Sequence, residues 1–122
     1  MSRLIAMAFP VLQGKEQEMQ EFATNLKGDH YEEFQASRRQ LGVRETTFLQ
    51  QTPMGQLVIV TLEGEDPEKA FADFAKENNA FTKWFMENVK RINGLDLQAP
   101  FPGPMPTLIV DSGPVMETAG VV

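Results

Sequence analysis

Cysteine is absent from this chain of 122 residues, and histidine, tyrosine and tryptophan each occur once. Without cysteine, neither a disulfide framework nor a thiolate metal site can form. A single histidine is a poor basis for a transition-metal cluster, so we expect no metal site. The absence of cysteine also fits a cytoplasmic location, which the sequence therefore favours.

Basic residues are scarce as well, with 11 Lys and Arg against 17 Asp and Glu and a formal net charge of −6. Nucleic-acid binding requires a basic surface that displaces counterions, and no run of lysine or arginine supplies one. The apolar N-terminal stretch "LIAMAFPVL" is too short to span a bilayer and has only Arg3 as a positive flank, so it predicts a buried strand rather than a signal peptide. We therefore expect neither a nucleic acid nor a membrane as a partner.

A repeated pattern of strand and helix runs through the chain. With 42% hydrophobic and 23% charged residues, the composition is typical of one globular domain, which we place at residues 1–113 with a C-terminal tail at 114–122. Strand-like runs and helical spacing alternate along it, with strands expected at residues 3–12, 43–52, 56–63 and 107–111 and helical stretches at 15–41 and 66–93. Gly28 interrupts the first helical stretch, which predicts either one kinked helix or two in series. Asn78 and Asn79 form a softer break in the second.

This order, β-α-β-β-α-β, predicts an α+β fold of the ferredoxin-like type: a four-stranded antiparallel sheet with two helical segments on one face. The first and third strands are the most apolar, so we expect them at the centre of the sheet and the second and fourth at its edges. Asp66 and Pro67 mark the start of the second helical stretch, and Gly42 and Gly94 mark helix ends.

The first and third strands have no polar side. Residues 4–9 and 58–60 are all apolar, yet the helices can cover only one face of the sheet. The other face would expose a broad apolar patch, which soluble monomers rarely tolerate. A homodimer through this sheet face would bury the patch. The alternative is that the tail folds back over the same face.

Two longer stretches, "SRRQLGVRETTFLQQTPMGQLVIVTLEGEDPEKAF" and "FTKWFMENVKRINGLDL", resemble a bacterial family of uncharacterised function within the dimeric α/β-barrel superfamily. That superfamily includes the antibiotic-biosynthesis monooxygenases and the stress-responsive barrel proteins. The resemblance implies a back-to-back sheet dimer with a small-molecule pocket between helices and sheet in each subunit. Members use this pocket for cofactor-free oxygenation, haem degradation, isomerisation or chlorite chemistry. It brings no catalytic residues to this chain.

Candidate site residues interrupt or flank the two apolar stripes. His30 and Asn78 are polar positions near the middle of the two helical stretches, and each needs a hydrogen-bond partner if it faces the apolar layer. His30 is a candidate general base because its ordinary pKa lies near neutrality. The resemblance offers haem, with His30 as an axial ligand, as a less favoured alternative to a cofactor-free site. The plainer interpretation is that His30 bonds a neighbouring carboxylate, from Asp29 or Glu33.

The other candidates are Tyr31, Phe34, Arg38 and Trp84. Tyr31 and Trp84 could line a pocket and present a polar tip, although Trp84 also fits an ordinary core position. Arg38 lies in a last helical turn, where its charge complements the helix dipole. One turn past Phe34, it could instead reach a carboxylate or phosphate of a ligand from the pocket rim. Four methionines, Met7, Met19, Met54 and Met86, could supply an adaptable wall.

Two functions follow from these expectations. The first is an enzyme, a cofactor-free oxygenase or isomerase that acts on a small, partly apolar molecule, and it requires His30 or Tyr31 to face a closed pocket. The second is a non-catalytic ligand-binding or assembly module, in which His30 faces solvent. The fold alone does not choose between them.

Overall fold

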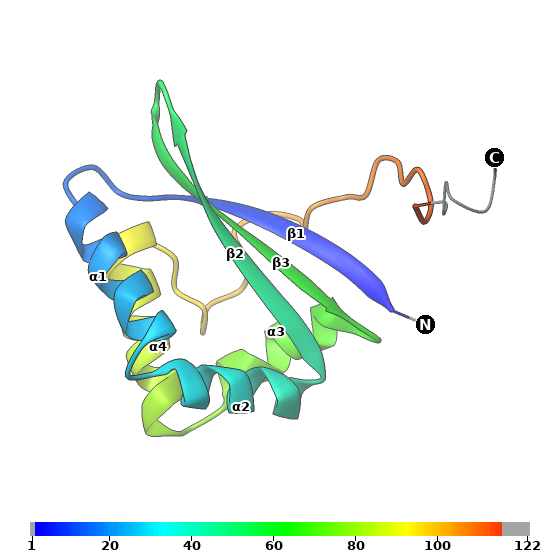
Figure 1. Ribbon diagram of the computed structural model, residues 1–122, viewed down its shortest axis with the longest axis horizontal. Coiled ribbons are helices and arrows are strands. Elements are labelled where there is room, and N and C mark those ends of the chain that lie inside the picture. Colours follow the sequence, from blue (N-terminus) through cyan, green and yellow to red (C-terminus); the bar gives the residue numbers. More distant parts are fainter. Residues whose placement is uncertain (1, 116–122) are drawn as a thin grey trace.

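The computed structural model describes residues 2–115, and within them it contains a three-stranded antiparallel sheet and four helices (Figure 1). The expected α+β class is confirmed. The elements follow one another as β1 (Arg3–Pro10), α1 (Glu16–Lys27), α2 (Tyr31–Leu41), β2 (Val43–Thr52), β3 (Gly55–Gly64), α3 (Pro67–Lys76) and α4 (Ala80–Asn93). The strand order is β1-β3-β2, and the helices lie on one side of the sheet (Figure 1).

Each predicted helical stretch is in fact a pair of helices. Residues 28–30 separate α1 from α2, which selects the second of the two alternatives at Gly28. In the second stretch, the Asn79 side chain accepts a hydrogen bond of 2.8 Å from the backbone N–H of Thr82 and so begins a new helix. The ends follow the local signals: Asp66 caps α3, and Gly42 closes α2 with a left-handed φ of 75°.

The strand register decides which side chains face the helices. Met7 lies opposite Val60, and Val60 lies opposite Thr47, so these three share one face. This helix-facing side consists of Ile5, Met7 and Phe9 on β1, Val58, Val60 and Leu62 on β3, and Val43, Glu45, Thr47 and Leu49 on β2. The outer side consists of Leu4, Ala6 and Ala8, of Leu57, Ile59 and Thr61, and of Arg44, Thr46, Phe48 and Gln50.

Two apolar clusters hold the helices against the sheet. The larger cluster gathers aromatic side chains from α1, α3 and α4 around Val58, with Ile92 fully buried. The smaller one packs Ala70 of α3 against Met7, Val43 and Leu62 of the sheet. Burial of this apolar area is the main stabilising term. Residues of both clusters, together with residues of α2, also line a cavity.

The fourth strand, predicted at residues 107–111, is not a strand in this structure. Its side chains are largely in solvent, with Leu108 71%, Ile109 92% and Val110 79% exposed. Without a fourth strand beside it, β1 lies at an edge of the sheet and β3 is the central strand, so the prediction that the first strand is central is wrong. A β-branched run favours an extended backbone, but only a neighbouring strand edge can supply ladder hydrogen bonds. The four-stranded ferredoxin-like layout is therefore not formed by the described residues of one chain.

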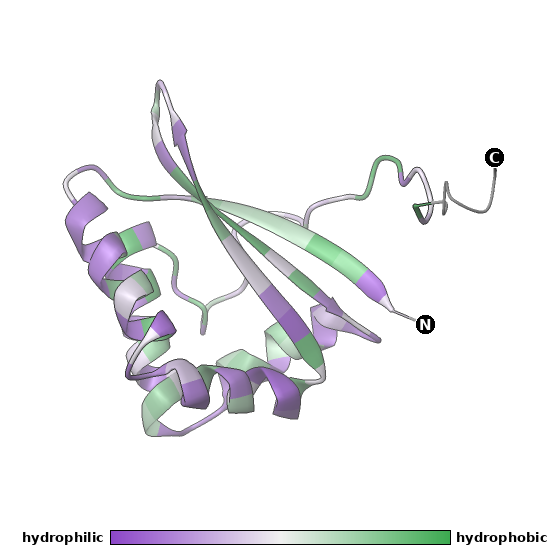
Figure 2. Cartoon of the chain, viewed as in Figure 1, coloured by the Kyte–Doolittle hydropathy of each residue, from purple (hydrophilic) through white to green (hydrophobic). Residues whose placement is uncertain are grey.

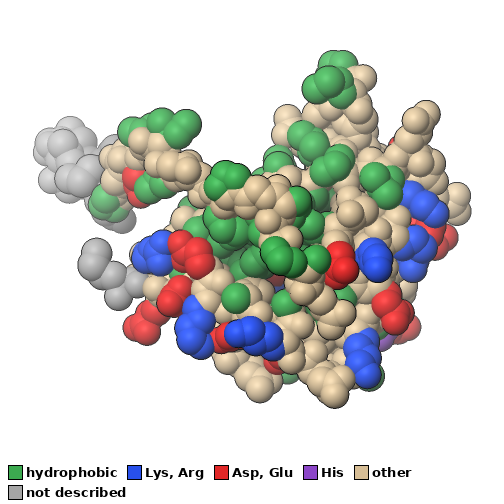
Figure 3. Space-filling view, turned by 180° about the vertical axis from the view of Figure 1, so that it is seen from behind, with side chains coloured by type: hydrophobic (Ala, Val, Ile, Leu, Met, Phe, Trp, Pro, Cys, Tyr) green, Lys and Arg blue, Asp and Glu red, His purple; other side chains and the backbone are tan. Residues whose placement is uncertain are grey.

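As expected, no other described segment covers the apolar side chains on the outer face of the sheet. Leu4 is 59% and Phe48 is 55% exposed, and Ala6 and Ala8 are exposed between them. Residues 107–113 and the first two residues of the expected tail, 114 and 115, do not cover this face, since they are exposed themselves. The rest of the expected tail, 116–122, lies outside the described residues. From behind, Figure 3 shows apolar side chains on the projecting tail and on the neighbouring part of the body, with most charged side chains below them.

Candidate functional site

A cavity of about 630 Å³ lies between the helices and the sheet. Ligand sites in proteins commonly have volumes of this order. Residues of all three strands line one side, all of them from the helix-facing side of the sheet except Phe48. Residues of all the helices, together with Leu95 and Leu97 of the following loop, line the rest. Most of these side chains are aliphatic or aromatic. Few polar side chains interrupt this wall: Gln20, Thr24, Lys27, Tyr31, Arg38, Glu45, Thr47 and Asn93.

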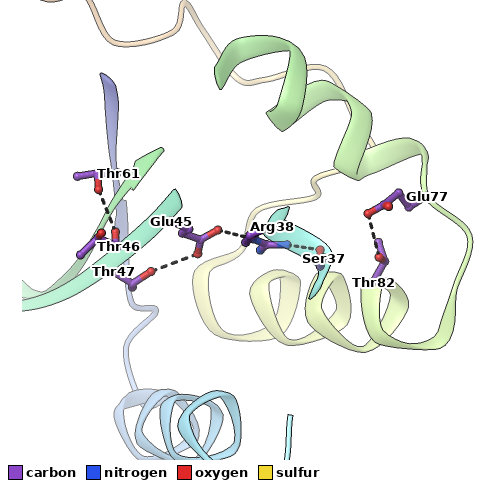
Figure 4. A network of polar contacts seen from close by, with 8 residues as sticks. All are labelled: Ser37, Arg38, Glu45, Thr46, Thr47, Thr61, Glu77 and Thr82. Atoms are coloured by element: carbon purple, nitrogen blue, oxygen red, sulfur yellow. Dashed lines mark hydrogen bonds and ion pairs between the residues drawn. The ribbon is translucent and has the colours of Figure 1, made fainter. Parts of the chain in front are cut away.

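A buried ion pair forms the most polar part of the wall. Arg38 in the last turn of α2 donates from Nε to Glu45 Oε1 of β2 at 2.8 Å, and the two side chains are only 8% and 7% exposed. The other carboxylate oxygen of Glu45 accepts from the Thr47 hydroxyl at 3.2 Å, and Arg38 Nη1 donates to Ser37 Oγ at 2.8 Å. Figure 4 shows this chain of contacts running from α2 to the sheet. Each charge is thus held by its partner and by a hydroxyl.

Aromatic rings surround the guanidinium of Arg38. Its Cζ lies 4.8 Å from the centre of the Phe34 ring, 4.4 Å from Phe74 and 4.8 Å from Phe85. Cation–π attraction partly replaces the water that a buried guanidinium loses. The guanidinium also carries more N–H groups than its two hydrogen bonds among the described residues use. Remaining donors are therefore held rigidly in an apolar setting, where a polar group of a ligand could meet them.

Of the residues singled out in the sequence, Tyr31, Phe34 and Arg38 line the cavity, whereas His30, Asn78 and Trp84 do not. His30 lies just before α2, where its Nδ1 is 2.9 Å from Glu33 Oε1 and its ring stacks on Trp84 with the ring centres 3.9 Å apart. This is the neighbouring-carboxylate arrangement. Trp84 packs against Phe22, with ring centres 5.3 Å apart, and Asn78 is exposed in the α3–α4 linker.

Sequence reasoning missed Glu45 and Thr47, although the alternation of β2 contains a signal for them. Both share a strand face with Val43 and Leu49, so a charged residue stands in a row that turns toward the helices. This signal becomes readable only once the register is known. The methionines divide similarly: Met7 and Met19 line the cavity, Met86 is buried in the larger cluster, and Met54 at the hairpin tip is 98% exposed.

Carboxylates with lowered pKa lie on the surface, away from the cavity. Hydrogen bonds from Lys15 and then Arg91 lower the pKa of Glu18, and Lys69 lowers that of Asp73. These side chains line no part of the cavity, and of their ion pairs only Arg91–Glu18 joins two elements, α4 and α1. Within residues 2–115 no cluster of three or more His, Asp or Glu side chains could hold a metal ion, and every helix there is too short or too polar to span a bilayer.

Comparison of the chain with protein-family models, with curated proteins and with solved structures finds no match in any of the three. The resemblance to the dimeric α/β-barrel superfamily therefore stays a prediction.

Proposed function

We propose that this protein binds a small, largely apolar molecule with one uncharged polar group in the cavity between helices and sheet. One observation carries the proposal: a cavity of about 630 Å³ with an aliphatic and aromatic wall contains one buried ion pair, Arg38 with Glu45. Apolar walls provide affinity through burial, and a single polar feature orients the ligand.

The preference for an uncharged polar group follows from the ion pair. Arg38 and Glu45 neutralise each other, so this part of the wall has no net charge to offer. An anionic ligand would have to compete with Glu45 for Arg38 and would leave the Glu45 carboxylate buried and unpaired, which is costly. A hydroxyl or carbonyl group can instead accept from a remaining guanidinium N–H without breaking the pair.

Catalysis on the bound molecule is a second candidate, in the manner of a cofactor-free isomerase or oxygenase. The position of Glu45 supports catalysis, because among the described residues that line the cavity Glu45 is the one with a carboxylate. It would accept a proton from the ligand, a role that His30 is poorly placed to fill since His30 lies outside the lining. Glu45→Gln keeps the shape of the side chain. Turnover that falls while binding persists would assign this role to Glu45.

The assembly that we propose is a homodimer through the outer face of the sheet, of the dimeric α/β-barrel type. Its support is the exposure of Leu4, Ala6, Ala8 and Phe48 on one continuous face around the half-buried Ile59. A second copy buries this patch with the same surface on both sides. The cavity lies mainly on the other side of the sheet, with Phe48 as the outer-side residue among its lining.

Binding can be tested with 6-propionyl-2-dimethylaminonaphthalene, a neutral apolar dye whose single carbonyl can accept from a guanidinium N–H. We expect saturable fluorescence enhancement with the wild type, and at least about tenfold weaker binding to Thr47→Phe, whose ring occupies the cavity. Three controls should bind like the wild type: Thr47→Val, which removes only the hydroxyl; Gln51→Phe, which adds the ring on the same strand outside the lining; and His30→Ala. Equal binding by Thr47→Phe and the wild type would show that the dye sits elsewhere. Native mass spectrometry of the purified protein then identifies any co-purified ligand.

A further inference from the structure

Residues 107–111 form an apolar run without a partner. Leu108, Ile109 and Val110 are each more than two thirds exposed, at 71%, 92% and 79%. None of the backbone groups of this run is hydrogen-bonded to the sheet of the same chain within residues 2–115. Gly113 N–H donates to Asp111 Oδ1 at 2.8 Å, which marks a turn after the run. An extended, β-branched and exposed segment of this kind is suited to adding to a sheet edge.

The free edge of β1 is the matching surface. β1 pairs only with β3, so every second residue turns its backbone N–H and C=O away from the sheet. β2 also lies at an edge, but Arg44, Glu45, Gln50 and Gln51 make it polar, which discourages pairing. From Leu4 to Phe9, β1 has no charged residue, and Figure 2 shows it hydrophobic over most of its length.

The path of the chain presents the run to another molecule. The Phe101 ring packs between Phe9 and Phe71, with ring centres 6.2 Å and 5.9 Å away, and Met105 packs on the smaller apolar cluster. These contacts hold the loop beside β1. After Pro106 the chain then projects away from its own sheet (Figure 1). Proline at 104 and 106 keeps this exit extended and limits its backbone hydrogen bonding.

We propose that residues 107–111 of each protomer add as a fourth strand to the β1 edge of a second copy, so that two copies exchange their C-terminal segments. The proposal rests on the homodimer proposed above and names the segment and the edge that complete it. Antiparallel pairing with Leu108 opposite Ala6 puts Ile109 beside Ile5 and Asp111 beside Arg3, which matches apolar with apolar and acid with base. Twofold symmetry then fills both edges and covers both runs at once.

The first experiment places engineered thiols in the cysteine-free chain. In the double variant Ala6→Cys/Leu108→Cys, a mild oxidant should give a disulfide-linked dimer on a denaturing gel, because the paired residues come from different chains. A single chain with an internal disulfide would overturn the exchange in favour of pairing within one chain. The matched control Gln50→Cys/Leu108→Cys puts the first thiol on the opposite edge and should remain unlinked. Linkage in the control as readily as in the double variant would also overturn it.

The second experiment measures the mass in solution. The wild type should have twice the chain mass of 13.7 kDa. Leu108→Lys/Ile109→Lys should raise the dimer dissociation constant at least about tenfold. Val115→Lys, at a 98% exposed position beyond the turn, should leave it unchanged. Because these positions are in solvent in one chain, the variants should fold, which circular dichroism checks.

The outcomes separate the proposals. A wild type that is a single chain at every concentration overturns the homodimer and the exchange together. An unchanged dissociation constant in Leu108→Lys/Ile109→Lys overturns the exchange but leaves the sheet-face dimer. The proposal of a ligand in the cavity is tested separately, by the dye-binding experiment described above.

Discussion

Removing one member of the buried ion pair should be far more damaging than removing both. In Arg38→Met, the Glu45 carboxylate, only 7% exposed, loses its cation and keeps the Thr47 hydroxyl. Breaking a buried pair in this way typically costs about 3–5 kcal/mol, and the adjoining cavity can admit water, so we expect a loss of about 3 kcal/mol. For a chain of this size that lowers the melting temperature by roughly 10 °C.

The partner variant and the double variant complete a thermodynamic cycle. Glu45→Leu leaves the Arg38 charge among three phenylalanine rings, which hold it in part, so we expect a loss of about 2 kcal/mol. Arg38→Met/Glu45→Leu fills the same space with apolar side chains and should lose about 2 kcal/mol or less, which is about 3 kcal/mol short of the sum.

Urea denaturation, followed by circular dichroism, measures these differences in unfolding free energy. They are calculated from the shifts of the urea midpoint, provided that the dependence of the free energy on urea concentration is the same in all variants. Arg39→Met is the matched control, because Arg39 is the exposed neighbour on the same helical turn and its loss should change stability by less than about 0.5 kcal/mol. If Arg38→Met is as mild as Arg39→Met, or if the two single losses simply add, the pair does not have the buried, mutually dependent arrangement described above.

Two further outcomes test the surface and a strand end. Gly64→Ala should destabilise the fold by about 1–3 kcal/mol in urea denaturation, because the new Cβ would collide with the backbone carbonyl oxygen of Gly42; an unchanged midpoint contradicts this close approach. Lys15 and Arg91 lower the pKa of Glu18 below its ordinary value of 4.5, so its ionised form stabilises the folded state above pH 4.5, and this contribution is lost as the pH falls through the lowered pKa. Glu18→Gln should therefore melt below the wild type at neutral pH and equal it in acid, and a difference that persists in acid would refute the assignment.

Much of the local structure could be predicted because its causes are local. The β2 bounds agree with the predicted 43–52, since alternation and the flanking Gly42 and Pro53 depend on neighbours in the chain. The break at Asn79 is stronger than the sequence predicts, because its side chain caps a new helix and does not merely interrupt one continuous helix. The candidate site was predicted in part, since Tyr31, Phe34 and Arg38 line the cavity while His30 and Trp84 stack on each other outside it.

The sequence by itself determined the two helical stretches, the three strands of the sheet and the glycines that end α2 and α4, because caps, periodicity and left-handed glycines act over a few residues. It also determined that one sheet face is apolar beyond what the helices can cover. Only the tertiary structure decided that Glu45 meets Arg38, that β3 is the central strand and that residues 107–111 have no partner within the chain. Ion pairs across elements and strand ladders depend on register and on the path of distant segments, which no local preference specifies.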